Sequence, residues 1–323
     1  MQKQIKNALI LLLAFVAVIA ILAIMTDSFD SLQRADPALF SIAALFFIAS
    51  IVVWLIGWST LIKGRTTSLW QTTAVGFGCV FASLTPVQVG ADALRSVKLK
   101  EHGRVRYSES ISASMIVKGL KFLFIALIAS ISFITMFLNP VLELWVKAAL
   151  FSGFAVVILA TALFLLPLNK RFGIKIASLF KALSRFVKRA EKVSEYFQSY
   201  SAYLQTVSRP KLLFVLFLAF LSLALEFVSL FFCFLAAGAS IPLISVLALF
   251  SVLEILERTP FLPKGIGVVE AVGFIFLSTP AFTSMQLTTG QIGTVIILFD
   301  VARLVVPTVT SLVVYNLVPK MLK

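Results

Sequence analysis

Long apolar runs separated by short polar segments set the pattern of this chain. Six of these runs are long enough for a helix to cross the hydrocarbon core of a bilayer. They lie near residues 8–26, 39–61, 109–138, 147–167, 212–237 and 291–317. None alternates strictly between apolar and polar residues, as a barrel strand would, and only helices and closed barrels satisfy their backbone groups in lipid. The pattern therefore predicts an all-α, polytopic membrane protein with about six transmembrane helices.

Two more apolar stretches, near 66–95 and 243–279, are short and broken by glycine and proline. The first lies between Arg65 and Arg95. Because basic residues concentrate on the cytoplasmic side, both of its ends belong there. It has too few residues for two crossings, so the chain must enter the membrane and return. The second stretch lies between a span that ends outside and the last span, which must end at Lys320 and Lys323 inside. Both of its ends therefore belong outside, and it too must enter the membrane and return. We therefore predict two opposed re-entrant helical hairpins.

The turns of the two predicted hairpins resemble each other. TPVQVGAD places Pro86 and Gly90 shortly before Asp92, and LPKGIGVVE repeats the spacing of proline and glycine before Glu270. Broken helices in inverted repeats mark transporter substrate sites, and the N-terminus of a half-helix offers backbone N–H groups to an anion. We interpret the similarity as an inverted repeat that places Gly90 and Gly267 beside a substrate. Coincidence is the alternative.

The chain is strongly basic, with a net charge of +14. Much of this charge lies near 169–211, where ten Lys or Arg residues stand against Glu191 and Glu195. Apolar residues recur there at helical spacing from Ile176 to Val193, which predicts a basic amphipathic helix on the cytoplasmic leaflet. A solvated connector is the alternative. Positive charge near both ends predicts that both termini are cytoplasmic, so the charge indicates anionic lipid headgroups, not nucleic acid.

Composition narrows the class of protein further. The 323 residues are 60% hydrophobic and 13% charged, with a mean hydropathy of +1.04, which leaves too little charge to cover a soluble surface. Cys79 and Cys233 lie in apolar runs and His102 is the only histidine, so we expect no disulfide, metal or cofactor. A basic start and a long apolar run without a cleavage site predict a retained first span. Residues 1–323 are expected to form one integral membrane domain.

Twelve charged residues fall within the segments predicted to lie at membrane depth. An isolated charge there costs at least ~2.5–3.5 kcal/mol, so these residues must pair, reach an interface or line a polar cavity. Lys118 and Lys121 share one helix face and repel each other unless a substrate or an internal carboxylate lies between them. Both possibilities stay open. The acidic members are Asp92, Glu226, Glu254, Glu257, Glu270 and Asp300, and the basic members are Arg95, Lys118, Lys121, Arg258, Lys264 and Arg303.

The late stretch LPKGIGVVEA resembles the flippase-like membrane family named for the lysylphosphatidylglycerol synthase transmembrane region. That family typically carries Pro-Gly-Gly-x-Gly-x-x-Glu late in the chain. Pro263, Gly265, Gly267 and Glu270 match this motif, and Lys264 replaces its first glycine. The resemblance covers nearly the whole chain.

Two other segments compare with the family less closely. TPVQVGADALR resembles an earlier Pro…Gly-acid…Arg segment at Pro86, Gly90, Asp92 and Arg95, and Arg303 matches an arginine of the last long span. Where the family often has Glu-Arg-x-x-Asp in a middle span, this chain has VKGLK at 117–121. The replacement of acid by lysine indicates a more anionic substrate and puts in doubt any charge network carried over from the family.

The resemblance implies a membrane protein that moves lipids or helps to synthesise them, such as aminoacylated phospholipids, hopanoid-related lipids or polyprenyl-linked glycans. Members that make lysyl-phosphatidylglycerol add a soluble synthetase domain. This chain ends at Lys323, just after its last span, so aminoacyl transfer is not expected.

The leading hypothesis is therefore a lipid translocase, or a lipid-binding partner of one, in a bacterial cytoplasmic membrane. Lys118, Lys121, Lys264 and Arg303 would bind an anionic headgroup, while the carboxylates orient these bases or take up protons. Anionic membrane lipids are the expected partners, together with a lipid-synthesis enzyme. Two alternatives are an integral-membrane transferase acting on a lipid phosphate and an ion-coupled transporter of small solutes.

Overall fold

The computed structural model describes residues 2–62, 68–84, 89–103, 105–137, 144–183, 189–257, 263–279 and 287–321, and these residues form helices and no strands. In chain order the helices are α1 (Gln2–Met25), α2 (Phe29–Gln33), α3 (Pro37–Leu61), α4 (Leu69–Gly78), η1 (Val80–Ser83), α5 (Val89–Gly103), α6 (Tyr107–Phe137), α7 (Leu144–Leu165), η3 (Leu166–Leu168), α8 (Lys170–Leu183), α9 (Arg189–Leu204), α10 (Arg209–Ala236), α11 (Leu243–Glu257), η4 (Pro263–Gly265), α12 (Val268–Ser278), α14 (Thr289–Asp300), η5 (Val301–Val305) and α15 (Val306–Met321). The all-α prediction is confirmed.

Four helical segments are long and apolar enough to cross a membrane: Pro37–Leu61, Tyr107–Ile131, Arg209–Ala236 and Thr289–Leu317. They coincide with four of the predicted spans, so the chain is a multi-pass membrane protein. The predicted spans near 8–26 and 147–167 also fall on helices, α1 and α7. A total of six crossings stays a prediction.

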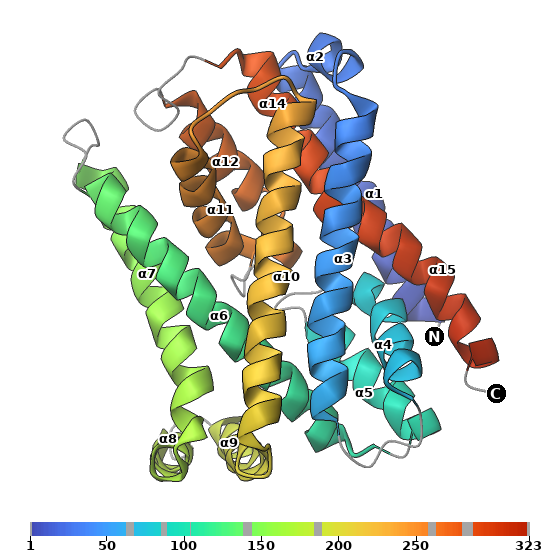
Figure 1. The fold of residues 1–323 in the computed structure, drawn as a ribbon, viewed down its shortest axis with the longest axis vertical. Helices are drawn as coiled ribbons and strands as arrows, with labels where there is room; N and C mark the ends of the chain where they lie inside the picture. The colour runs from blue at the N-terminus through green and yellow to red at the C-terminus, as the bar shows by residue number, and fades with distance from the viewer. Residues whose placement is uncertain are drawn as a thin grey trace.

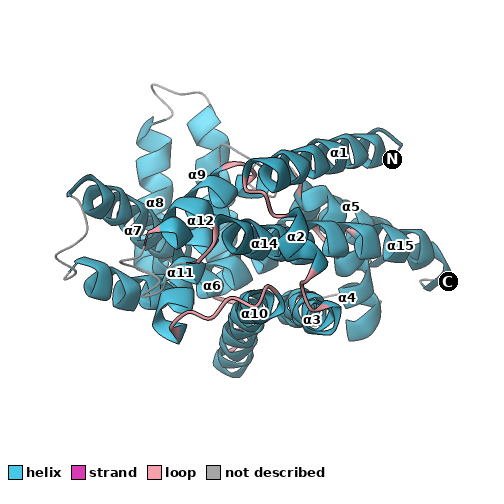
Figure 2. Cartoon of the chain, turned by 90° about the horizontal axis from the view of Figure 1, so that it is seen from above, coloured by secondary structure: helices cyan, strands magenta, loops and turns pink. Residues whose placement is uncertain are grey.

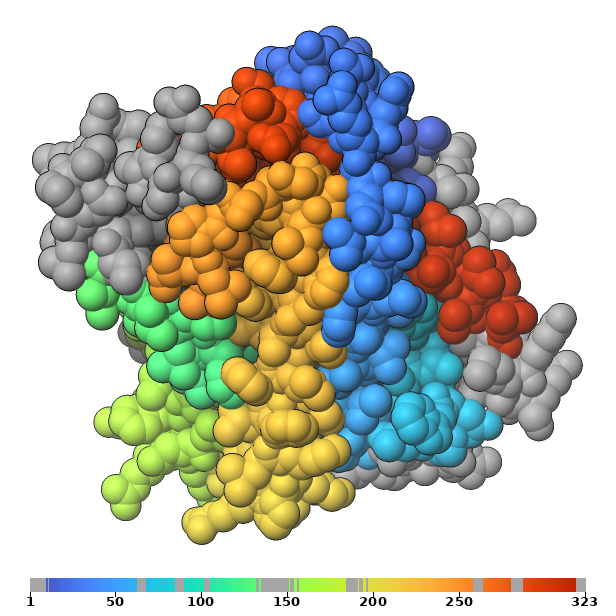
Figure 3. All heavy atoms as spheres, turned by 45° about the horizontal axis from the view of Figure 1, so that its top comes forward, coloured from blue at the N-terminus to red at the C-terminus, as the bar shows by residue number. Residues whose placement is uncertain are grey.

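Helices α3 and α10 form the centre of the bundle and pack along each other in opposite directions. The backbone N–H of Asp36, at the start of α3, donates to the carbonyl of Ala236 at the end of α10 (2.9 Å). Toward the other end, Gly57 lies against Val215 of α10. Figure 3 shows the two helices side by side on one face, α10 in yellow and α3 in blue.

Two pairs of short helices lie at opposite ends of this centre. In Figure 1, α4 and α5 occupy the lower half, and α11 and α12 occupy the upper half. Each pair follows one of the antiparallel helices α3 and α10. It precedes another long element, which is α6 for the first pair and the span that begins with α14 for the second. The two units therefore run in opposite directions, as the predicted inverted repeat requires. Residues 85–88 and 258–262, and with them Pro86 and Arg258, lie outside the described residues.

The basic segment near 169–211 forms two helices, where the sequence predicts a single one. Helices α8 and α9 pack side by side across the lower end of the bundle, seen end-on in Figure 1 and lengthwise in Figure 2. Two contacts join the helices. The Ser194 hydroxyl donates to the carbonyl of Ala177 (2.7 Å), where both side chains are small, and the rings of Phe180 and Phe197 stack 5.3 Å apart. Part of the predicted apolar stripe therefore contacts α9, while Leu179 stays exposed.

Candidate functional site

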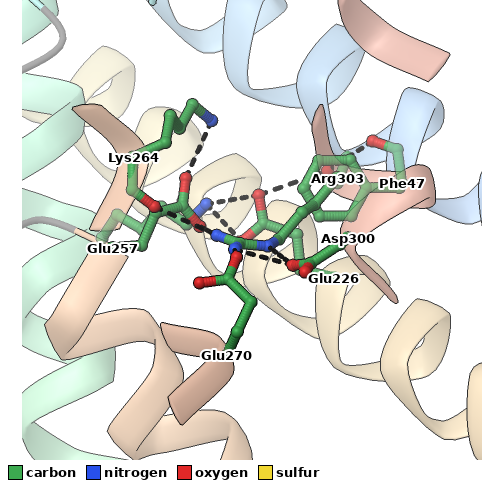
Figure 4. Close-up of polar contacts among 9 residues, drawn as sticks. Phe47, Glu226, Glu257, Lys264, Glu270, Asp300 and Arg303 are labelled. Carbon is green, nitrogen blue, oxygen red and sulfur yellow. Dashed lines mark hydrogen bonds and ion pairs between the residues drawn. The ribbon is translucent and has the colours of Figure 1, made fainter. Parts of the chain in front are cut away.

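The guanidinium of Arg303 lies at the centre of a buried network of charges (Figure 4). Its side chain is 1% exposed. The Nε atom donates to Oδ1 of Asp300 (2.7 Å), Nη2 donates to Oε1 of Glu270 (2.9 Å), and Nη1 donates to the carbonyl of Lys264 (3.1 Å). Asp300 and Arg303 are three residues apart, so they share one face of the last span and pair there. The network joins the last long helix to the turn between α11 and α12.

Arg303 lies on a local distortion of the last span. Residues Val301–Val305 form a π-helical turn between α14 and α15. Such turns are rare and occur frequently at functional sites, because the widened turn changes the direction of the side chains that it carries. The sequence does contain a signal for this distortion, because Pro307 has no backbone N–H to donate to the carbonyl of Arg303 four residues earlier. Sequence reasoning did not use this signal and so missed the distortion.

The turn before α12 has an unusual backbone that brings its groups toward Arg303. Lys264, Gly265 and Gly267 have φ angles of 55°, 68° and 89°, in the left-handed region that favours glycine. A Cβ atom on Gly265 would lie 2.8 Å from the carbonyl oxygen of Leu256, so this position also needs glycine for space. The turn directs the carbonyl of Lys264 toward Arg303.

Two carboxylates hold this turn in place. The ammonium of Lys264 donates to Oε1 of Glu257 on α11 (2.8 Å). Glu270, in the first turn of α12, accepts from the backbone N–H of Gly267 (2.5 Å), so the donor that the sequence assigned to an anionic substrate already has an internal partner. Gly267 is exposed, and apart from its own chain neighbours no described residue has an atom within 4 Å of the place that a Cβ would occupy.

Lys121 belongs to a second buried pair, with Glu226, which lies next to the Arg303 network in Figure 4. Its ammonium donates to both oxygens of Glu226 on α10, and the hydroxyl of Ser50 on α3 donates to the same carboxylate (3.3 Å). The side chains of Lys121 and Glu226 are each 8% exposed.

Lys118, one turn earlier on α6, belongs to a third group near the other helix pair. It donates to Asp92 of α5 (2.5 Å), which also accepts from Arg95 (3.1 Å). The guanidinium of Arg95 lies over the ring of Trp54 (4.9 Å) and donates to the carbonyl of Gly76 (3.2 Å). Gly90 is half-buried near the start of α5. The repulsion between Lys118 and Lys121 is thus relieved by two separate internal carboxylates.

Sequence reasoning also missed a face of α3. Ser50 and Trp54, which contact Glu226 and Arg95, lie four residues apart, and Trp58 follows after four more. Residues so spaced share one helix face. Polar and aromatic side chains at this interval are the pattern that would have indicated this face.

Within the part of the chain that the structure describes, every charged residue that it buries belongs to the set predicted from the sequence. Glu254 is buried on α11, one turn before Glu257. Oδ2 of Asp300 is buried and accepts no hydrogen bond from any described residue. The network therefore holds paired bases and a buried carboxylate oxygen to which no described residue donates. Substrate binding by these residues stays a prediction.

Comparison with known proteins gives a family and one distant relative. The family described as the lysylphosphatidylglycerol synthase TM region matches residues 8–311, which confirms the resemblance seen in the sequence. A UPF0104 membrane protein of Methanothermobacter thermautotrophicus is 21% identical over 265 residues, which cover 77% of this chain and 78% of that protein. No solved structure matches.

Proposed function

The chain belongs to the family of the lysylphosphatidylglycerol synthase TM region, and from this premise we propose that it moves an anionic lipid headgroup across a bacterial cytoplasmic membrane. The substrate class is a phospholipid or a polyprenyl-linked lipid. One observation carries the proposal: four basic side chains are held by carboxylates in the interior of a membrane protein, between the two pairs of short helices, α4–α5 and α11–α12. These bases are Lys118, Lys121, Lys264 and Arg303.

The proposed orientation places the lower end of Figure 1 in the cytoplasm, with both pairs of short helices re-entering the membrane. The two chain termini and the basic helices α8 and α9 lie toward this end, as the positive-inside bias requires. The opposite end carries α2, which contains Asp30 and lies in the chain between Asp27 and Asp36. In this orientation the facing ends of the two helix pairs lie near the midplane, where transporters of inverted-repeat architecture bind their substrates.

The proposed mechanism is an exchange of ion-pair partners. A phosphate headgroup replaces a carboxylate as the partner of a base, and the released carboxylate takes up a proton, so no charge stays unpaired in the membrane, where an isolated charge costs at least ~2.5–3.5 kcal/mol. Lys118 has the most accessible of the four bases, with 25% of its side chain exposed, and is the first contact. Asp92 and Glu270 are the proposed proton acceptors, and each orients its base while no headgroup is bound. The acyl tails stay in the bilayer throughout.

Mass spectrometry of co-purified lipids tests this proposal. The test variant is Lys118→Met, and the matched control is Lys98→Met, because Lys98 is also ion-paired on a helix (to Glu101, 2.8 Å) with 20% of its side chain exposed. We expect wild-type protein to be enriched in one anionic or polyprenyl-linked lipid relative to the bulk membrane. The Lys118 variant should lose this enrichment, and the Lys98 variant should keep it.

Other outcomes separate the competing hypotheses. Equal lipid enrichment in all three proteins would mean that Lys118 has only a structural role, and uptake of a soluble solute would then favour the ion-coupled transporter. A covalently altered lipid, formed by wild type alone, would favour the transferase. We also propose anionic lipids and a lipid-synthesis enzyme as partners, because a translocase needs a supply of its substrate lipid.

A further inference from the structure

A groove of about 490 Å³ opens between α6 and α7, on the outer surface of the bundle. Its walls are formed by residues Leu123 to Ser130 of α6 and Ile158 to Leu165 of α7. The hydroxyls that line it are turned inward: Ser130 donates to the carbonyl of Ala126 (2.7 Å) and Thr161 donates to that of Val157 (2.8 Å). The groove therefore offers hydrocarbon contacts along its length.

The groove is separate from the charge network. Lys118 and Lys121 lie on the face of α6 that contacts α5 and α10. Leu123 and Leu127 lie about half a helical turn away from them, on the opposite face. The wall of α6 therefore stands between the two sites, and an occupant of the groove contacts neither Lys118 nor Lys121.

The groove faces the lipid, not water. Leu127 and Ile158, on its rim, are 53% and 45% exposed. Since α6 is one of the helices long and apolar enough to cross the membrane, this exposed apolar surface lies within the hydrocarbon region. Its volume falls within the range of about 300–1,000 Å³ that is usual for ligand sites. A lipid chain is the occupant that such a surface accepts.

One end of the groove meets a strongly basic helix. Asn169 and Phe172, at the start of α8, line this end, and Lys170, Arg171 and Lys175 are exposed beside them. The sequence contains no acidic residue between Glu143 and Glu191, so nothing along this stretch of chain neutralises these bases. Helix α8 lies across the end of the bundle (Figures 1 and 2), at the level where headgroups border the hydrocarbon. This charge is complementary to an anionic headgroup.

We propose that the α6–α7 groove is a binding site for one anionic phospholipid, distinct from the central network. One acyl chain lies in the groove, and the phosphate of the headgroup contacts Lys170 and Arg171. The site holds a lipid of the same leaflet as α8 at the surface of the protein. It does not depend on the proposed translocation, because it shares neither of the network lysines of α6.

Photo-crosslinking with mapped positions tests this site. The full chain is placed in nanodiscs of phosphatidylcholine that contain a trace of one of two probes. Each probe carries a diazirine on one acyl chain, and its headgroup is either phosphatidylglycerol or phosphatidylcholine. We expect the phosphatidylglycerol probe to label peptides that contain 123–130 and 158–166 several-fold more than the phosphatidylcholine probe does. The double variant Lys170→Gln/Arg171→Gln should lower phosphatidylglycerol labelling to the phosphatidylcholine level.

A space-filling variant tests the groove itself. Ala162 lines the groove and Ala155, seven residues earlier on α7, is exposed outside it. Ala162→Phe should abolish labelling of these peptides by both probes, and Ala155→Phe should leave it unchanged; thermal melting checks that both variants fold. Equal labelling by the two probes in wild type would overturn the preference for an anionic lipid. Unchanged labelling of Ala162→Phe would overturn the groove as the site.

Discussion

Lys264 occupies a backbone conformation that glycine adopts far more readily than lysine. Its φ is 55°, and its carbonyl and ammonium both belong to the charge network, through Arg303 and Glu257. The family motif has glycine at this position, so this chain accepts backbone strain and gains a positive charge beside the network. Strain held at a position with a specific contact is typical of functional sites.

Two substitutions at this position separate the strain from the charge. Lys264→Gly and Lys264→Met both remove the ion pair to Glu257, but only glycine fits the left-handed backbone without cost. The glycine variant should therefore be more stable than the methionine variant by about 1 kcal/mol, measured as the thermal midpoint in detergent. Both should lose lipid enrichment if the Lys264 ammonium binds a headgroup. Enrichment at the wild-type level in both would assign this lysine a structural role alone.

Gly265 gives a second test of the same turn. Gly265 and Gly238 both have positive φ angles, 68° and 63°, but only Gly265 is crowded, by the backbone of α11. Gly238→Ala should cost about 1–2 kcal/mol, from the left-handed backbone alone. Gly265→Ala should cost about 1–3 kcal/mol more, from the clash with Leu256. Equal thermal midpoints for the two variants would show that the turn and α11 are not in contact.

At the scale of elements, the α8–α9 pair is attached to the bundle by a few polar contacts. The phenol of Tyr203 in α9 donates to the carbonyl of Leu61 at the end of α3 (2.5 Å), and the phenol of Tyr200 donates to that of Phe164 in α7 (2.8 Å). Burial raises the pKa of the Tyr203 phenol, so this group stays protonated and remains a donor. These bonds satisfy carbonyls at helix ends, which have no partner within their own helix.

Tyr203→Phe tests how much this attachment contributes. The variant removes the donor to Leu61 and keeps the ring, so it should lose about 1 kcal/mol of local stability. Hydrogen exchange of the amides in α9 should become faster, while exchange in α3 above its last turn stays as in wild type. Tyr107→Phe is the control, because Tyr107 is 42% exposed. Similar exchange rates in both variants would mean that α9 is held by its apolar contacts.

At the scale of the whole molecule, the antiparallel arrangement of α3 and α10 gives the two halves opposite orientations. In each half, a base on the span that follows a pair of short helices contacts an acid in the first turn of the second helix of that pair. Lys118 contacts Asp92 of α5 after the α4–α5 pair, and Arg303 contacts Glu270 of α12 after the α11–α12 pair. The equivalence was suggested by the Pro-x-x-x-Gly spacing alone. In three dimensions it extends to the ion pair that follows each turn.

The proposed orientation of the whole chain can be measured by cysteine labelling. The native Cys79 and Cys233 are buried, so they give little background. A membrane-impermeant maleimide, added to intact cells, should label Gln33→Cys on α2. It should label Ser178→Cys on α8 only after the cells are permeabilised. Labelling of the α8 position in intact cells would reverse the orientation.

The sequence by itself determined the class of this protein, its four clearest spans and a set of charged residues that includes every one that the described structure buries. Hydrophobic length and the cost of charge in lipid are local properties, so they can be deduced from the chain alone. Only the tertiary structure decided which charges pair, because helical spacing shows which residues share a face but not what lies opposite. Lys118 and Lys121 share a face of α6 and yet contact carboxylates of two different helices, α5 and α10. The division of the basic segment into α8 and α9 likewise depends on packing between elements distant in sequence, because α9 contacts α7 and α3 through Tyr200 and Tyr203.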